Sequence, residues 1–110
     1  MQIITATIIS CRPPDEDDGW LITSWVDADR SKRSLTIDTN GFCQREMPFR
    51  SGSGIKSISY HRDRIELVFN EQLATKLELP TEISFVDEIS AINYEKLLAF
   101  AEDLYIPPSD

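Results

Sequence analysis

The sequence has one histidine and two cysteines among its 110 residues, and this scarcity excludes several kinds of site. A zinc centre with several histidine ligands cannot be built around His61 alone. Cys11 and Cys43 are too few for a disulfide framework, so we expect two reduced thiols. No run approaches the ~20 apolar residues of a membrane-spanning helix, and the first residues lack the basic leader of a signal peptide. Together these absences favour a cytoplasmic protein.

Charge is the most informative feature that the sequence does have. The formal net charge is −8, but residues 1–29 carry −5, residues 30–64 carry +5 and residues 65–110 carry −8. A chain this acidic lacks the basic surface that nucleic acid or an anionic membrane requires. We therefore expect no nucleic acid and no membrane as partners, and a basic protein as the partner that suits this charge.

Length and composition predict a single domain that spans residues 1–110. A chain of this size buries roughly two-thirds of its unfolded surface. The hydrophobic share of 41% and the charged share of 27% are close to globular averages. We find no internal repeat and no low-complexity tract, so one core is expected.

Runs of β-branched and aromatic residues predict short strands in the first half of the chain. The expected strands are residues 3–9, 20–26, 34–38 and 42–47. In residues 20–26, alternation places Trp20, Ile22 and Val26 on one face and Leu21 and Trp25 on the other. Both faces of this strand are therefore expected to be at least partly covered.

Two connections in the first half have recognisable turn chemistry. Asn40 followed by Gly41 predicts a type I′ hairpin turn, because both residues tolerate a positive φ. Residues 48–54 (PFRSGSG) have the composition of a flexible connection.

The second half predicts more strands and two helices. Strands are expected at residues 55–60, 64–69 and 82–86, with a helix of about two turns after an Asn70 N-cap. A final helix is indicated by an apolar stripe of Tyr94, Leu97, Leu98, Ala101, Leu104 and Tyr105. The predicted fold class is α+β: a mainly antiparallel sheet of six to seven short strands, a short helix before the last strand, and a C-terminal amphipathic helix packed on the sheet.

A catalytic site centred on His61 is the weakest functional hypothesis. His61 falls in a predicted turn, where a histidine is more often a solvated polar residue. Ser57, Ser59 and Cys43 are conceivable nucleophiles, but none stands in a nucleophile-elbow motif. Residues 51–54 lack the Gly-Lys-Ser/Thr ending of a phosphate-binding loop. We therefore expect neither an enzyme nor a cofactor.

Residues 15–18 form the densest cluster of acids. The cluster lacks the spacing and the final glutamate of an EF-hand loop, so no metal is expected. Two interpretations remain open: a solvated loop, or a loop that steers and binds a basic protein. The candidate partner-binding residues are Asp15, Glu16, Asp17, Asp18, Asp27 and Asp29.

Residues 54–85 contain a characteristic succession: a glycine before an I-x-S-I strand, a charged turn, an alternating strand, a short helix, a leucine and an E-I-x-F strand. The residues are Gly54, Ile55, Ser57, Ile58, Arg62, Asp63, Ile65, Leu67, Phe69, Ala74, Leu77, Leu79, Glu82, Ile83 and Phe85. This succession resembles the C-terminal half of the bacterial immunity protein 10 family. The C-terminal helix and the acidic-then-apolar layout of residues 15–26 fit as well. The middle departs from the family, because residues 42–46 stand where the family has a longer segment.

The resemblance implies a protein that binds and silences a bacterial toxin and has no catalysis of its own. A toxin that attacks nucleic acid would be basic, which agrees with the acidic charge of this chain. The alternative is a small structural or regulatory module that assembles with itself, as a homodimer for example, through residues 20–26 or another sheet edge.

Overall fold

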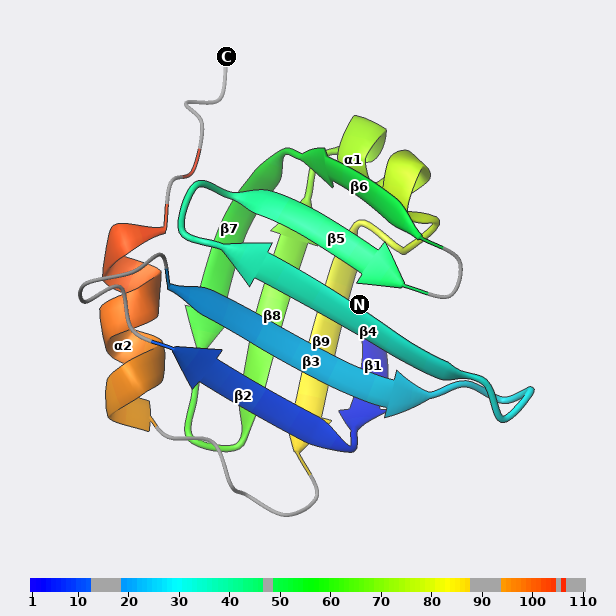
Figure 1. The fold of residues 1–110 in the computed structure, drawn as a ribbon, viewed down its shortest axis with the longest axis horizontal. Coiled ribbons are helices and arrows are strands. Elements are labelled where there is room, and N and C mark those ends of the chain that lie inside the picture. Colours follow the sequence, from blue (N-terminus) through cyan, green and yellow to red (C-terminus); the bar gives the residue numbers. More distant parts are fainter. Residues whose placement is uncertain (13–18, 47–48, 88–93, 105, 107–110) are drawn as a thin grey trace.

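The computed structural model describes residues 1–12, 19–46, 49–87, 94–104 and 106. This part of the chain contains nine strands and two helices (Figure 1). The strands form two sheets that pack against each other. The prediction of a mainly antiparallel α+β fold is confirmed at this level. The prediction of one sheet of six to seven strands is wrong, because the strands divide between two sheets.

The larger sheet is antiparallel throughout, with the strand order β2-β3-β4-β5-β6. Its strands are β2 (Ile8–Arg12), β3 (Trp20–Val26), β4 (Lys32–Asp38), β5 (Phe42–Glu46) and β6 (Arg50–Ser53). Each strand lies beside its sequence neighbour, as short connections favour. Because β3 is paired on both sides, it offers no free edge to another chain, contrary to the edge-pairing hypothesis for residues 20–26.

The smaller sheet is mixed, with the order β1-β9-β8-β7. Its strands are β1 (Gln2–Ala6), β7 (Ile55–Tyr60), β8 (Arg64–Phe69) and β9 (Glu82–Asp87). β1 runs parallel to β9, with Ile4 opposite Phe85. Two strands from distant parts of the sequence are therefore neighbours, which no local pattern could indicate.

The run at residues 3–9, predicted as one strand, contributes to both sheets. The chain bends at Thr7, whose backbone N–H and Oγ1 hydroxyl both donate hydrogen bonds to the Ser24 carbonyl at 2.7 and 3.1 Å. Ala6 before the bend and Ile9 after it are both buried. The sequence gives no sign that the chain passes from one sheet to the other here, because the residues on both sides of Thr7 favour strand conformation equally well.

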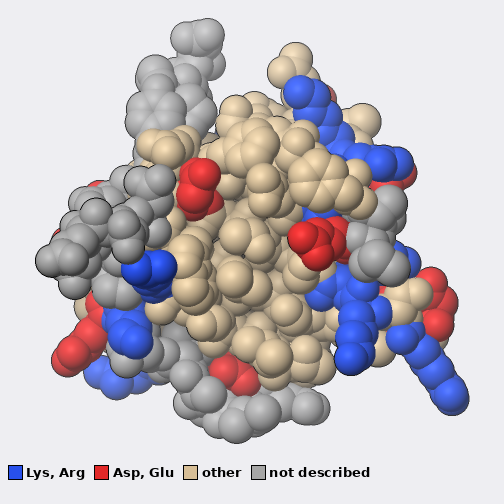
Figure 2. Space-filling view, viewed as in Figure 1, with Lys and Arg blue, Asp and Glu red and all other residues tan. Residues whose placement is uncertain are grey.

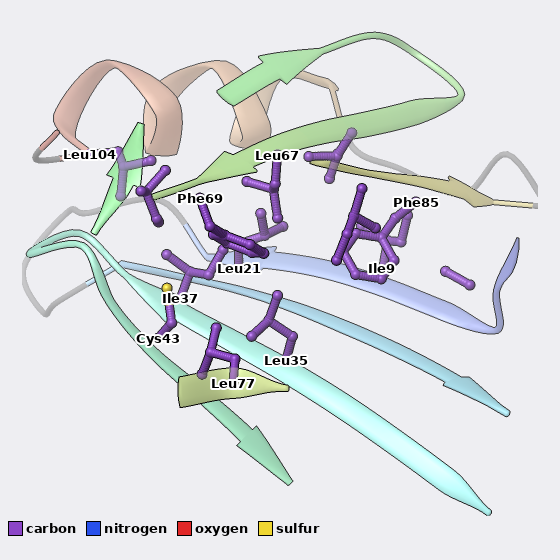
Figure 3. Close-up of a cluster of buried hydrophobic side chains, with 14 of the residues drawn as sticks. Ile9, Leu21, Leu35, Ile37, Cys43, Leu67, Phe69, Leu77, Phe85 and Leu104 are labelled. Carbon is purple, nitrogen blue, oxygen red and sulfur yellow. The ribbon is translucent and has the colours of Figure 1, made fainter. Parts of the chain in front are cut away.

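The core lies between the two sheets, whose strands cross steeply (Figures 1 and 3). Leu21 and Ile37 enter it from the five-stranded sheet, and Leu67 and Phe85 enter it from the four-stranded sheet. Trp25 packs its ring 5.3 Å from that of Phe85, centroid to centroid. Each such fully buried large side chain contributes roughly 1.5–3 kcal/mol of hydrophobic stabilisation.

The short helix α1 (Glu71–Leu77) confirms the predicted helix and its cap. Asn70 Oδ1 accepts the Leu73 N–H at 2.7 Å, as an N-cap should. The helix packs on β6, within the segment predicted to be a flexible connection. A Cβ atom at Gly52 would lie 3.2 Å from Leu73 Cδ1, so the lack of a side chain lets the helix approach the strand. The glycine-rich composition serves packing here.

The second helix, α2 (Tyr94–Asp103), lies at one side of the molecule, against β2, β3 and β7 (Figure 1). Leu97 and Phe100 are buried positions of this helix, and Leu104, directly after it, is buried as well. The helix therefore closes the side opening between the two sheets. Neither α1 nor α2 is long and apolar enough to cross a membrane, and these are the helices of the described residues.

The β4–β5 hairpin forms as predicted but uses a different turn. Gly41 has φ 84°, whereas Asn40 is not among the described residues with positive φ. The Gly41 N–H donates to the Asp38 carbonyl at 3.0 Å. A type I turn followed by a left-handed residue produces this arrangement, so the type I′ prediction is wrong.

Candidate partner-binding surface

The β3–β4 hairpin holds two of the predicted partner-binding acids. Its loop closes with an Arg30 N–H to Asp27 carbonyl bond of 2.8 Å and an Asp27 N–H to Ser31 carbonyl bond of 2.9 Å. Arg30 takes the left-handed position with φ 69°. The loop therefore repeats the type I turn of the β4–β5 hairpin, with an arginine where that hairpin has a glycine.

Both acids of this loop are engaged within the protein. Asp27 accepts hydrogen bonds from Trp25 Nε1 at 3.1 Å and from Arg33 Nε at 2.7 Å. Asp29 accepts the Ser31 N–H at 2.9 Å and lies 3.4 Å from Arg33 Nη2. Hydrogen bonds from the backbone of Ser31, and to a lesser extent from its side chain, hold the pKa of Asp29 below its ordinary value. These carboxylates orient the hairpin before any partner arrives.

The hairpin as a whole is positive. Asp27 and Asp29 stand beside Arg30, Lys32 and Arg33, so residues 27–33 carry a formal charge of +1. Attraction of a basic partner depends on the summed local field rather than on single carboxylates. The electrostatic support for Asp27 and Asp29 as partner-binding residues is therefore weak.

The other four predicted acids, Asp15 to Asp18, lie outside the described residues. The described residues on either side of them are Arg12 at the end of β2 and Gly19 before β3. Arg12 is paired with Trp20, and Trp20 with Asp38, so Arg12 lies at the Trp20 end of the five-stranded sheet.

The outer surface of the five-stranded sheet is covered by no described helix (Figure 1), and we call it the open face. Strand alternation directs every second side chain of β2 to β6 onto it. Its central cross-strand row is Ser10, Ile22, Thr36, Gln44 and Ser51. Figure 2 shows a broad uncharged centre with both acidic and basic side chains around it.

Two shallow hollows occupy opposite ends of the open face. One, of about 280 Å³, lies between Trp20 and Phe42. The other, of about 430 Å³, is lined by Ile8, Val26 and Glu46, among others. Both are open to solvent, and they share no lining residue. Their shape suits contact with another surface better than enclosure of a small molecule.

The two cysteines lie on the inner side of the same sheet and cannot pair. The strand registers place Cys11 opposite Leu21, Leu21 opposite Ile37, and Ile37 opposite Cys43. Three strand spacings separate the thiols by about 14 Å. Burial raises the pKa of Cys11 to about 11 and that of Cys43 to about 12. Both are free thiols held in the neutral form.

His61 lies in the β7–β8 turn, as predicted. Its side chain is 43% exposed, with Nε2 4.0 Å from Glu66 Oε1. Arg64 Nε donates to the same carboxylate oxygen at 3.0 Å. Cys43, one of the conceivable nucleophiles, is buried on β5 of the other sheet. The structure therefore does not bring this thiol to the histidine.

A buried arginine is the feature that sequence analysis missed. Arg45 is only 7% exposed, and its Nη1 lies 3.7 Å from Glu78 Oε2. Arg50 Nε lies 3.6 Å from the same oxygen. The alternation of β5 contained the signal, because it places Arg45 on the same face as buried Cys43.

Comparisons with protein-family models, with well-characterised proteins and with solved structures gave no significant match. Across residues 1–12, 19–46, 49–87, 94–104 and 106, no group of three or more histidine, cysteine, aspartate or glutamate residues is placed to hold a metal ion.

Proposed function

We propose that this chain is an immunity-type protein of the bacterial cytoplasm, which binds and neutralises a cognate toxin without catalysis of its own. The proposed partner is a basic protein domain, and the proposal involves no nucleic acid, membrane, metal or cofactor. The acids of residues 15–18, with Asp27 and Asp29, are the proposed partner-binding residues. The proposal rests on two supports, the arrangement of residues 54–85 and the charge of the chain.

The observation that carries the proposal is the arrangement of residues 54–85. They form β7, β8, α1 and β9 in the order that the resemblance implies. Ile55, Ile65 and Phe85 are buried in the core. The resemblance therefore rests on residues that build the fold, which supports a shared scaffold more directly than a shared partner.

Gly54, the first residue of that succession, has a physical reason to be glycine. Its φ is +136°, a region that side chains disfavour. A Cβ atom at this position would collide with the side-chain amide of Asn70. The Gly54 carbonyl also accepts the Asn70 N–H at 2.8 Å. The glycine thus lets the residue before β7 lie directly against the N-cap of α1.

The charge of the chain supports a basic partner. A formal charge of −8 accelerates encounter with a cationic surface and makes the association rate fall with salt. The positive β3–β4 hairpin takes little part in this attraction. Residues 15–18 carry four acids in sequence and are the stronger half of the proposed binding set.

The proposal is tested with the product of the gene next to the one that encodes this chain. Co-expression should relieve growth inhibition by that protein's toxic domain, and the two purified proteins should form a stable complex. Reversing Asp15, Glu16, Asp17 and Asp18 to lysine should slow association and reduce its salt dependence. Reversing four exposed acids elsewhere in the chain, Glu71, Glu82, Glu95 and Glu102, makes the same change in net charge. This matched control should have a smaller effect.

Failure of the wild-type chain either to relieve inhibition or to bind would refute the immunity function. Binding with unchanged association rates in the quadruple variant would retain that function and exclude residues 15–18 from the interface.

Self-association is the second candidate function. The observation that favours it is the open face, which no described helix covers (Figures 1 and 2). Pairing through residues 20–26 as an edge is not the route, because β3 is an interior strand.

A further inference from the structure

The open face differs in charge from the rest of the molecule. Arg12, Lys32, Asp38 and Glu46 alternate outward on its strands, so two bases and two acids give it a formal charge of zero. The remainder of the chain therefore carries the whole net charge of −8. A neutral face gives little attraction to a strongly basic surface and little repulsion to another acidic molecule.

We propose that a second copy of this chain docks on the open face, so that the five-stranded sheets of two molecules pack against each other in a two-fold symmetric dimer. This inference rests on the second candidate function, self-association, and is independent of toxin binding. A second copy is the proposed occupant because two molecules that each carry −8 repel each other through their other surfaces. The electrostatic repulsion is smallest when they approach through the neutral open face.

The chemistry of the face suits contact with itself. In a two-fold dimer the same patch meets its own image, so both sides must offer donors, acceptors and apolar area together. Thr36 and Gln44 supply a hydroxyl and an amide, each able to donate and to accept hydrogen bonds. Trp20, Ile22 and Phe42 supply apolar area, and Phe42 is 39% exposed. Sheets that pack face to face align within about 30°.

The size of the face predicts a weak dimer. Five strands at about 4.8 Å spacing span about 24 Å, and strands of this length run about 20 Å. Two such faces bury on the order of 1,000 Å² together, which is at the lower limit for a specific interface. The dimer should therefore form at tens to hundreds of micromolar and dissociate on dilution.

Sedimentation velocity of the purified chain tests the inference directly. Between about 10 and about 500 µM the wild-type protein should shift from monomer toward dimer. Raising the salt should lower the dissociation constant several-fold, because screening reduces the repulsion between two molecules of charge −8. A protein that stays monomeric over this range overturns the proposal.

Two substitutions locate the contact. Gln44→Lys, at the exposed centre of the face, should raise the dissociation constant about ten-fold or more, because each copy places a charge against the other. Ile3→Lys is the matched control: Ile3 is 71% exposed on β1 of the other sheet. This variant should dimerise like the wild type. Amide chemical shifts on dilution should change along the Ser10–Ser51 row.

Equal loss of the dimer in both variants, or loss in Ile3→Lys alone, overturns the proposal, since the contact would then lie elsewhere. If Gln44→Lys fails to fold, Thr36→Arg repeats the test one strand away. None of these outcomes bears on the immunity function, because the experiment contains no toxin.

Discussion

Arg33 Nε lies 2.7 Å from Asp27 Oδ2 across the base of the β3–β4 hairpin. The arginine side chain is only 16% exposed, so this contact is shielded on one side. Asp27 also accepts the indole N–H of Trp25, whose ring packs in the core. One carboxylate thus connects the hairpin to the interior, and its role in stability follows from the structure more directly than any role in binding.

Asp27→Asn should destabilise the protein by about 1 kcal/mol, because the amide keeps an acceptor for Trp25 but loses the ion pair with Arg33. Urea unfolding at neutral pH measures this change. Asp29→Asn is the matched control: Asp29 is 61% exposed and forms the longer contact with Arg33. A larger loss for Asp29→Asn than for Asp27→Asn would contradict this account.

Arg30 and Gly41 occupy the same left-handed position in their two hairpin turns, and we expect substitutions at these positions to change stability in opposite directions. Arg30→Gly should stabilise the chain by roughly 0.5 kcal/mol, since relief of a left-handed conformation outweighs the added freedom of the unfolded state. Gly41→Ala should destabilise it by about 1 kcal/mol or more. Thermal unfolding measures both changes.

Arg30→Ala separates backbone from charge in that experiment. It removes the same cation but keeps a side chain at φ 69°, so it should not stabilise the protein. A gain in stability for Arg30→Ala equal to that for Arg30→Gly would show that charge, rather than backbone conformation, is responsible.

Local patterns predicted the local parts of this fold. Alternation separated Leu21 and Trp25 from Trp20 on opposite faces of one strand, and the structure buries Leu21 and Trp25. Asn70 was identified as a helix cap. The parallel pairing of β1 with β9 joins residues about eighty positions apart and leaves no trace in either segment. The bend at Thr7 is likewise fixed by its contact with Ser24 on another strand.

The candidate site shows the same division. A count of charge along the chain assigned Asp27 and Asp29 to an acidic segment that ends just before Arg30. The hairpin instead folds these acids against Arg33, and the local charge changes sign. Asp27 and Asp29 were counted in a different charge segment from Arg33, although the turn places them side by side. The charge of a surface can therefore be assigned only after the hairpin is known.

The two thiols should be unreactive in the folded protein. Neither Cys11 nor Cys43 should react rapidly with Ellman's reagent near pH 8, and both should react after unfolding, because burial raises both pKa values and hinders access. Cys11 should react first, since it is only partly buried whereas Cys43 is fully buried. A native disulfide would contradict the register that separates them.

These thiols should also make the stability of the folded protein depend on pH in the alkaline range. A thiol pKa raised by folding means that the folded protein holds its proton more tightly, so the stabilisation is complete below the ordinary value of 9.0. It is lost as pH rises from there toward the folded values of about 11 for Cys11 and about 12 for Cys43. Urea midpoints should therefore fall above pH 9, and Cys43→Ala should reduce that slope.

Arg45 and Glu78 predict stability changes of opposite sign within one ion pair. Arg45 is buried, and its Nε has no hydrogen-bond partner in the described structure. Arg45→Met should be neutral or stabilising, because a well-packed apolar chain avoids the desolvation cost of the guanidinium. Glu78→Gln should destabilise by about 1 kcal/mol, since it leaves that guanidinium buried without its counter-charge. Urea unfolding of both variants and of the double variant measures the coupling.

The double variant decides between the two causes. If the loss in Glu78→Gln comes from the stranded charge of Arg45, adding Arg45→Met should restore stability to near the wild-type level. Arg50→Ala is the control, because Arg50 touches the same carboxylate oxygen but is 46% exposed and should matter little. A loss that persists in the double variant would instead show that the Glu78 carboxylate stabilises the protein without Arg45.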